Sequence, residues 1–219
     1  MYEKLRSRII AGPLNTYSLL SLAGVVGPLV FIAADLTAAI SQLGYSPIRD
    51  SISSLAWSSM GWLQTIGFLT IGLLVEVFVA GLFFNIRGRR GFGFGIGLLA
   101  CFGFGLLLIG AFRTDPVGSQ HTIEGTIHSF ASYAVFFIFP VASFLIALSL
   151  KKDRYWKGLF IHTIVTSSLA LALMIGRLWL PDELSWFGLY ERILVANTII
   201  WIEIMAIRLL RLSLRASRY

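Results

Sequence analysis

The sequence is poor in the residues that build metal and redox sites. It contains a single cysteine, Cys101, and three histidines. One cysteine excludes a disulfide framework, a cysteine-based zinc site and an iron–sulfur ligand set, and the histidines are too few to ligate a pair of transmembrane haems. We therefore predict no cofactor, and we expect Cys101 to be a small core residue.

Charged residues are also scarce. They make up 13% of the 219 residues, against about a quarter in a typical soluble protein, and 57% of the residues are hydrophobic. This composition is that of a membrane protein. A helix needs about 20 mainly apolar residues to cross the hydrocarbon. Six windows meet this requirement, at residues 17–43, 61–84, 91–112, 127–150, 157–180 and 187–210. The connections are short, so we predict a single all-α domain, residues 1–219, folded as an integral membrane bundle of six transmembrane helices.

The basic residues indicate which way the bundle faces. Fourteen of the 18 lysines and arginines fall in the two terminal segments and in the two connections on the same side. The positive-inside rule then places both termini in the cytoplasm of a multi-pass protein of the cell membrane. Because these residues lie at helix ends and are not gathered on one surface, we expect no nucleic-acid partner. Membrane lipids and other membrane proteins are the expected partners.

The N-terminal segment has some features of a signal peptide, since Lys4, Arg6 and Arg8 precede an apolar run. The apolar run is longer than the about 7–15 residues of a typical signal peptide. We therefore expect a retained helix.

The stretch RGRRGFGFGIG, residues 87–97, has glycines at alternate positions. It lacks the G-x-G-x-x-G spacing of a nucleotide-binding loop, and no strand precedes it. Gly91 with Gly95, and Gly93 with Gly97, instead have the small-xxx-small spacing that allows transmembrane helices to approach closely. We predict close helix packing on these glycines.

The polar stretch GYSPIRDSISSLAW, residues 44–57, separates the first two apolar windows. After Pro47, a short interfacial helix at residues 50–60 would have Asp50 or Ser51 as its N-cap and apolar residues at helical spacing. Trp57 would anchor it at the membrane surface. This interpretation explains the serines and the tryptophan, but it leaves Arg49 and Asp50 unexplained.

Each of the four arginines expected at the outer side lies near an acid in the sequence. The pairs are Arg49 with Asp50, Arg113 with Asp115, Arg192 with Glu191, and Arg177 a few residues before Asp182. If the helix ends converge, these groups build a polar cup at the mouth of the bundle. The alternative is a set of separate, solvated loop ends.

The densest group of ionisable residues is FRTDPVGSQHTIEGTIHSFAS, residues 112–132. If the fourth helix starts near Ser119 or Thr122, His121, Glu124 and His128 recur at intervals of three and four and share one face. Such a face could bind a divalent metal or supply an acid and a base. The spacing matches no established zinc motif, so no metal is assigned. We favour hydrogen-bonded side chains that join this helix to the outer loops.

Three acids, Asp35, Glu76 and Glu203, fall inside apolar windows. A charge there costs a few kcal/mol or more, so such residues face the bundle interior, find a partner or stay protonated. A proton or ion pathway is the functional interpretation. Their different depths argue against it.

Three motifs resemble the polytopic membrane proteins catalogued as domain-of-unknown-function family 998. They are SPIRDSISSLAW, FRTDP and GTIHSFAS. The resemblance covers most of the chain and implies about six helices, an outer loop with Asp50 and Ser53, an acid at Asp115 and a histidine at His128. It implies no reaction.

Three classes of function remain. The first is an outward-facing polar site for a lipid head group or another amphiphile, with His128 as the candidate acid or base and Asp115 as the residue that orients it. A serine nucleophile within residues 51–54 is an option that no elbow motif supports. The candidate ligand-binding residues are Asp50, Ser53, Arg113, His121, Glu124, Arg177, Glu191 and Arg192. The alternatives are a non-catalytic accessory subunit of a larger membrane complex and a small transporter or proton-coupled carrier.

Overall fold

The computed structural model describes residues 15–116, 118–179 and 185–216, and within these ranges it is helical with no strand. Six helices are long and apolar enough to cross a membrane, which confirms the predicted fold class. The long helices are α2 (Thr16–Ser41), α3 (Gly61–Asn85), α4 (Phe92–Ala111), α5 (Ile123–Leu150), α6 (Phe160–Arg177) and α7 (Phe187–Ala216). Two short 3-10 helices, η1 (Ser53–Trp57) and η2 (Lys157–Leu159), lie between them. The basic residues Lys4, Arg6 and Arg8, and the acid Asp182, lie outside the described residues.

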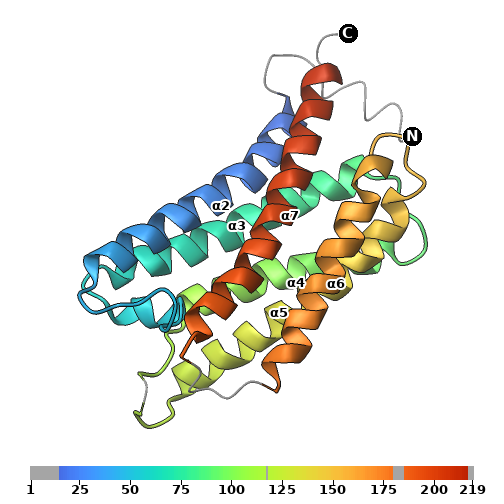
Figure 1. Cartoon of the computed structure of the whole chain (residues 1–219). Helices are drawn as coiled ribbons and strands as arrows, with labels where there is room; N and C mark the ends of the chain where they lie inside the picture. The colour runs from blue at the N-terminus through green and yellow to red at the C-terminus, as the bar shows by residue number, and fades with distance from the viewer. Residues whose placement is uncertain (1–14, 117, 180–184, 217–219) are drawn as a thin grey trace.

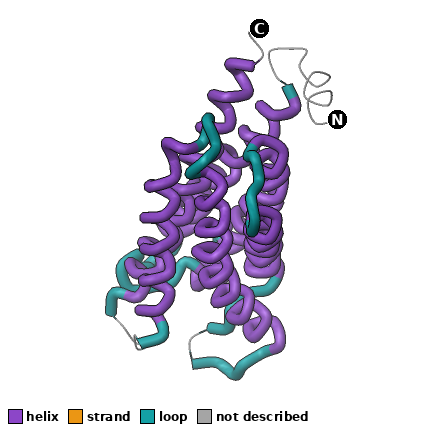
Figure 2. The backbone as a smooth tube through the Cα atoms, turned by 90° about the vertical axis from the view of Figure 1, so that its right-hand side faces the viewer, coloured by secondary structure: helices purple, strands orange, loops and turns teal. Residues whose placement is uncertain are grey.

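The long helices form a closed ring. Each packs against the next along the chain, and α7 returns to pack against α2 (Figure 1). The least extensive of these contacts is the one between α6 and α7. The connections from α2 to α3 and from α4 to α5 lie at one end of the bundle, and the start of α2 and the end of α7 lie at the other (Figures 1 and 2). We call the first of these the outer end, following the orientation that the basic residues predict.

Close approach of α2, α3 and α7 depends on Gly24. A Cβ atom at this position would lie 2.7 Å from the ring of Phe78 and 2.8 Å from the Cβ of Ala206. Both of these neighbours are fully buried. The absence of a side chain at Gly24 therefore sets the distance between three helices.

The glycines of α4 divide between two faces. Gly95 packs against α5, where a Cβ would lie 3.1 Å from the carbonyl oxygen of Ala142, as the spacing predicts. Gly93 and Gly97 have open space around them, and Cys101 is exposed on the helix surface. The expectation that Cys101 lies in the core is therefore wrong. Because α4 is apolar on all sides, its sequence does not show which face is buried.

The two predicted helix starts at the outer end have different outcomes. Thr122 is the N-cap of α5, and its hydroxyl accepts the N–H of Gly125 at 3.0 Å. The helix predicted at residues 50–60 is shorter, Ser53–Trp57, and the side chain of its N-cap residue, Ile52, makes no capping hydrogen bond. Ser51 still accepts the N–H of Ser54 at 3.1 Å, whereas Asp50 accepts the N–H of Ser46 at 2.8 Å.

Replacing Gly24 with alanine is expected to lower the thermal stability of the purified protein, because overpacking a buried contact costs about 1–3 kcal/mol. Gly93→Ala is the matched control. It adds the same methyl group to a helix in open space, where exchanging glycine for alanine favours the helix. The measurement is thermal unfolding in detergent. Equal shifts for the two variants would contradict this packing.

Candidate functional site

Arg192, near the start of α7, is the centre of a polar cluster at the outer end. Its guanidinium donates to the carbonyl oxygens of Pro47 at 2.9 Å and Asp50 at 3.1 Å, and to the hydroxyl of Tyr45. It also lies 3.7 Å from the carboxylate of Asp35 on α2. The sequence neighbour Glu191 is not its ion-pair partner, because adjacent helical residues point in different directions.

The backbone of residues 47–50 lies directly on the first turn of α7. The N–H of Gly188 donates to the carbonyl of Arg49 at 3.2 Å, and the N–H of Leu189 donates to that of Ile48 at 2.9 Å. These bonds satisfy donors that a helix N-terminus leaves without intrahelical partners. A Cβ at Gly188 would overlap the carbonyl of Asp50, so a glycine is needed at this position.

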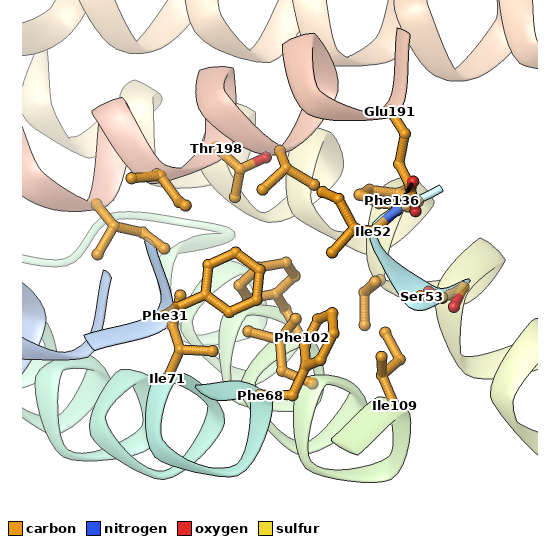
Figure 3. A pocket seen from close by; sticks show the side chains of 16 residues that line it. Phe31, Ile52, Ser53, Phe68, Ile71, Phe102, Ile109, Phe136, Glu191 and Thr198 are labelled. Carbon is orange, nitrogen blue, oxygen red and sulfur yellow. Dashed lines mark hydrogen bonds between the residues drawn. The ribbon is translucent and has the colours of Figure 1, made fainter. Parts of the chain in front are cut away.

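Glu191 and Tyr45 join η1 to the same cluster. The carboxylate of Glu191 accepts the N–H of Ile52 at 2.7 Å, and Figure 3 shows it extending from α7 to this residue. The hydroxyl of Tyr45 donates to the carbonyl of Ser51 at 3.0 Å. Burial raises the pKa of Tyr45 to about 12, against the opposing effect of its hydrogen bond with Arg192. Tyr45 therefore keeps its proton and remains a donor at neutral pH.

Arg49 and Asp50 form a local pair. The Nε of Arg49 donates to Asp50 at 2.8 Å, and this hydrogen bond lowers the pKa of the Asp50 carboxyl. The side chain of Arg49 is 61% exposed. The pair therefore occupies the surface of the outer end, while the main chain of the same residues contacts α7.

His128, on the second turn of α5, contacts two other segments. Its Nδ1 lies 2.8 Å from the carbonyl oxygen of Phe112, the residue that ends α4. Its Nε2 lies 3.0 Å from the hydroxyl of Ser53, the first residue of η1. The imidazole is buried, with 5% of the residue exposed. The ring thus joins α4, α5 and η1.

Asp115 has a different role from the predicted one. Its carboxylate accepts the N–H and the hydroxyl of Thr122, at 3.0 and 2.7 Å, and these bonds lower the pKa of Asp115. It therefore fixes the start of α5, while the carbonyl of Phe112 is the group bonded to His128. A Cβ at Gly125 would overlap the Asp115 carboxylate, so this arrangement also needs a glycine.

His121 and Glu124, the other two residues of the predicted ionisable helix face, make separate contacts. His121 lies before the start of α5 with its side chain 95% exposed, 3.8 Å from Asp115. Glu124 accepts the backbone N–H of Arg113 at 2.7 Å. Among the described residues, no group of three or more His, Cys, Asp and Glu side chains could bind a metal ion.

Trp57 joins η1 to the connection between α4 and α5. Its indole N–H donates to the carbonyl of Thr114 at 2.9 Å, and the guanidinium of Arg113 lies 5.8 Å from the centre of its ring. The predicted membrane anchor is thus also a tertiary contact. The guanidinium of Arg113 therefore lies against this ring and forms no ion pair with Asp115, its predicted partner.

An open cavity of about 1080 Å³ lies between these clusters, and we call it the outer cavity. Its walls come from the connections between α2 and α3 and between α4 and α5, and from α5, α6 and α7. Six of the ten candidate residues line it, namely Asp50, Ser53, His121, His128, Arg177 and Glu191. The other four, Arg113, Asp115, Glu124 and Arg192, do not line it and instead stabilise its walls. Lining residues that the sequence did not single out include Tyr45, Ser129, Tyr133 and Tyr190.

A small apolar pocket of about 40 Å³ lies deeper in the bundle. The rings of Phe31, Phe68 and Phe102 project into it, with Glu191 and Ser53 at one edge (Figure 3). It shares four lining residues with the outer cavity, namely Ser53, Ser132, Phe136 and Glu191. The outer cavity and the apolar pocket therefore share part of their walls.

The three intramembrane acids lie apart from one another. Asp35 belongs to the Arg192 cluster, whereas Glu76 packs against α4 at Gly103. Glu203 has a buried carboxylate oxygen with no hydrogen-bond partner. None of the three lines the outer cavity or the apolar pocket. This arrangement gives no support to a pathway through them.

A family model described as Protein of unknown function (DUF998) matches residues 25–208. The chain belongs to this family. The match includes the three motifs that meet around His128, from the α2–α3 connection, the end of α4 and the start of α5. No curated protein and no solved structure matches the chain. The family description assigns no reaction, and the six long apolar helices are those of a multi-pass membrane protein.

Arg192→Met is expected to destabilise this DUF998 protein by about 2–4 kcal/mol, because it leaves the Asp35 carboxylate and two carbonyls without their charged partner. Arg49→Met is the matched control, since Arg49 is exposed and pairs only locally. Thermal unfolding in detergent measures both. A loss at Arg49 as large as at Arg192 would contradict the assigned roles.

Proposed function

We propose that the protein binds an amphiphile with a phosphate or carboxylate in its head group, in the outer cavity and on the outer side of the cell membrane. The observation that supports this most directly is the cavity itself. Polar side chains of the connection between α2 and α3 and apolar side chains of α5, α6 and α7 line it, and it shares lining residues with an apolar pocket in the bundle. Its volume of about 1080 Å³ is at the upper end of the range for small-molecule sites, about 300–1,000 Å³.

The polar wall has the chemistry to bind an anionic group. Arg49 and Arg177 both line it, and guanidinium groups form charge-assisted hydrogen bonds with phosphate and carboxylate. Nε and Nη2 of Arg49 already donate to Asp50, so Arg49 would bind an anion through Nη1. Ser51 and Ser54 add hydroxyl groups from the connection between α2 and α3. Asp50 accepts a hydrogen bond from Arg49, and Glu191 accepts one from the backbone N–H of Ile52. Both carboxylates are therefore held in the wall by their own partners, which reduces their repulsion of an anionic ligand.

The apolar wall is formed by helices that also face the bilayer. Phe136 on α5, Met174 on α6 and Leu194 on α7 line the cavity. The contact between α6 and α7 is the least extensive in the ring. In this proposal a lipid enters sideways between these two helices, past the hydrogen bond from the Tyr190 hydroxyl to the Leu173 carbonyl. Its chains then lie along the apolar wall and its head group among the arginines.

An accessory-subunit role is a second candidate, supported by a separate observation. Gly93 and Gly97 lie on an exposed face of α4 with open space around them. Small residues on an exposed transmembrane face allow close packing of another helix. Co-purification of a fixed protein partner from mild detergent would favour this role.

Ser132→Phe is expected to reduce amphiphile binding, because Ser132 lies where the outer cavity meets the apolar pocket and a ring there fills the junction. Thr126→Phe is the matched control, on the same helix at an exposed position that does not line the cavity. The measurement is photo-crosslinking in nanodiscs with a diazirine-bearing phosphatidylglycerol and, separately, a diazirine-bearing fatty acid. The two probes distinguish a phosphate ligand from a carboxylate ligand.

We expect crosslinks at the lining residues of α5, α6 and α7, reduced at least several-fold by Ser132→Phe and unchanged by Thr126→Phe. Crosslinks spread evenly over all lipid-facing helices, with no effect of Ser132→Phe, would contradict the proposal.

A further inference from the structure

We propose that Ser53 and His128 are a nucleophile and its general base, and that they cleave a carboxylic ester of the amphiphile in the outer cavity. This inference rests on the proposed binding function. It gives that site a reaction class, the hydrolysis of an acyl ester.

The hydrogen bonds of His128 fix the direction of proton transfer. A carbonyl oxygen only accepts, so the Nδ1 atom, 2.8 Å from the oxygen of Phe112, carries the hydrogen. In the neutral imidazole, Nε2 is then an acceptor, and the hydroxyl of Ser53 donates to it at 3.0 Å. This is the arrangement in which a histidine withdraws the proton of a serine nucleophile.

The surrounding structure holds the side chains of Ser53 and His128 in place. Phe112 ends α4, with its own N–H bonded to Leu108 at 3.0 Å, so its carbonyl acts as the fixed group that orients the base. The N–H of Ile52, next to Ser53, is bonded to Glu191. The imidazole is buried and bonded at both nitrogens, so its orientation is set before any ligand enters.

Ser53 is placed where the ester of an amphiphile would lie. It lines the outer cavity, the apolar pocket and a third, smaller cavity next to His128. In an acylated lipid, the ester joins the polar head region to the apolar chain. A head group among the arginines and a chain along Phe136 would therefore bring the ester carbonyl to the level of Ser53.

The reaction has two steps, acylation of Ser53 and hydrolysis of the acyl-serine. Ser53 Oγ attacks the ester carbonyl carbon and gives its proton to His128 Nε2, and the carbon–oxygen bond to the alcohol breaks as His128 returns that proton to the leaving alkoxide. Water then attacks the acyl-serine, again losing a proton to His128, and the Ser53 oxygen leaves and recovers the proton. The products are the alcohol and the carboxylic acid. Ser132 lies one turn after His128 and lines the same cavity. In the proposed reaction its hydroxyl donates to the oxyanion.

The test uses an alkyl fluorophosphonate, which labels activated serines, on the full chain in nanodiscs. We expect a label on Ser53 in the wild-type protein and none in Ser53→Ala. In His128→Gln the labelling rate should fall by a factor of at least about 100, since a general base contributes at least this factor. Ser58→Ala is the matched control, because Ser58 ends the same 3-10 helix and lines none of the three cavities. It should label at the wild-type rate.

Two further measurements separate a reactive serine from a structural hydrogen bond. A fluorogenic acyl ester of a lipid should be hydrolysed by the wild-type protein and not by Ser53→Ala. In Ser53→Cys, the thiol should react with iodoacetamide faster when His128 is present than in the Ser53→Cys, His128→Gln double variant. An unlabelled Ser53, or equal labelling with and without His128, overturns the proposal.

The failure of this reaction can be told apart from the failure of binding. Lipid photo-crosslinking is measured on the same wild-type preparation. Crosslinks in the outer cavity without fluorophosphonate labelling would overturn the reaction and leave the binding function in place. The absence of both crosslinks and labelling would contradict the reaction and the binding function together.

Discussion

The outer end of this bundle depends on the guanidinium of Arg192. It contacts α2 through Asp35, contacts the backbone of residues 47–50, and belongs to α7, so one side chain joins three parts of the chain. The connection it fixes continues directly into η1, which carries Ser53 to His128. Because the arginine is largely enclosed, its donors have few solvent molecules to bond with instead, and the carbonyls it binds would lose their charged partner if it moved. The position of one wall of the outer cavity thus follows from this interaction.

The number and approximate bounds of the helices could be predicted from the sequence, because runs of about 20 apolar residues are decided by composition alone. Which face of a helix is buried could not be predicted in α4, since all its faces are apolar; Gly95 packs on α5 while Cys101 is exposed. The start of α5 could be predicted because Thr122 is a good N-cap, although the apolar window begins about one turn later, at residue 127. Sequence patterns therefore defined the elements, and packing determined their orientation.

In the candidate site, residues that are close in the sequence were in several cases not the partners found in the structure. Every outer arginine was matched to a nearby acid, but Arg192 pairs with Asp35 on another helix, and Arg113 lies beside the ring of Trp57. Asp115 was the expected partner of His128, whereas the group bonded to the imidazole is a backbone carbonyl, which every residue has and no sequence pattern reveals. The residue types were informative all the same. The polar residues of the three motifs meet at one end of the bundle, some as supports and some as cavity walls.

The central claim is that the outer cavity holds an amphiphile against Ser53 and His128. The most direct measurement is an electron cryomicroscopy map of the protein purified from its native membrane into nanodiscs, at a resolution that shows side chains. The account predicts elongated non-protein density, with a compact end near Arg177 and an extended end along Phe136 and Leu194. A map in which α6 has closed against α7 and the cavity is filled by side chains would contradict it.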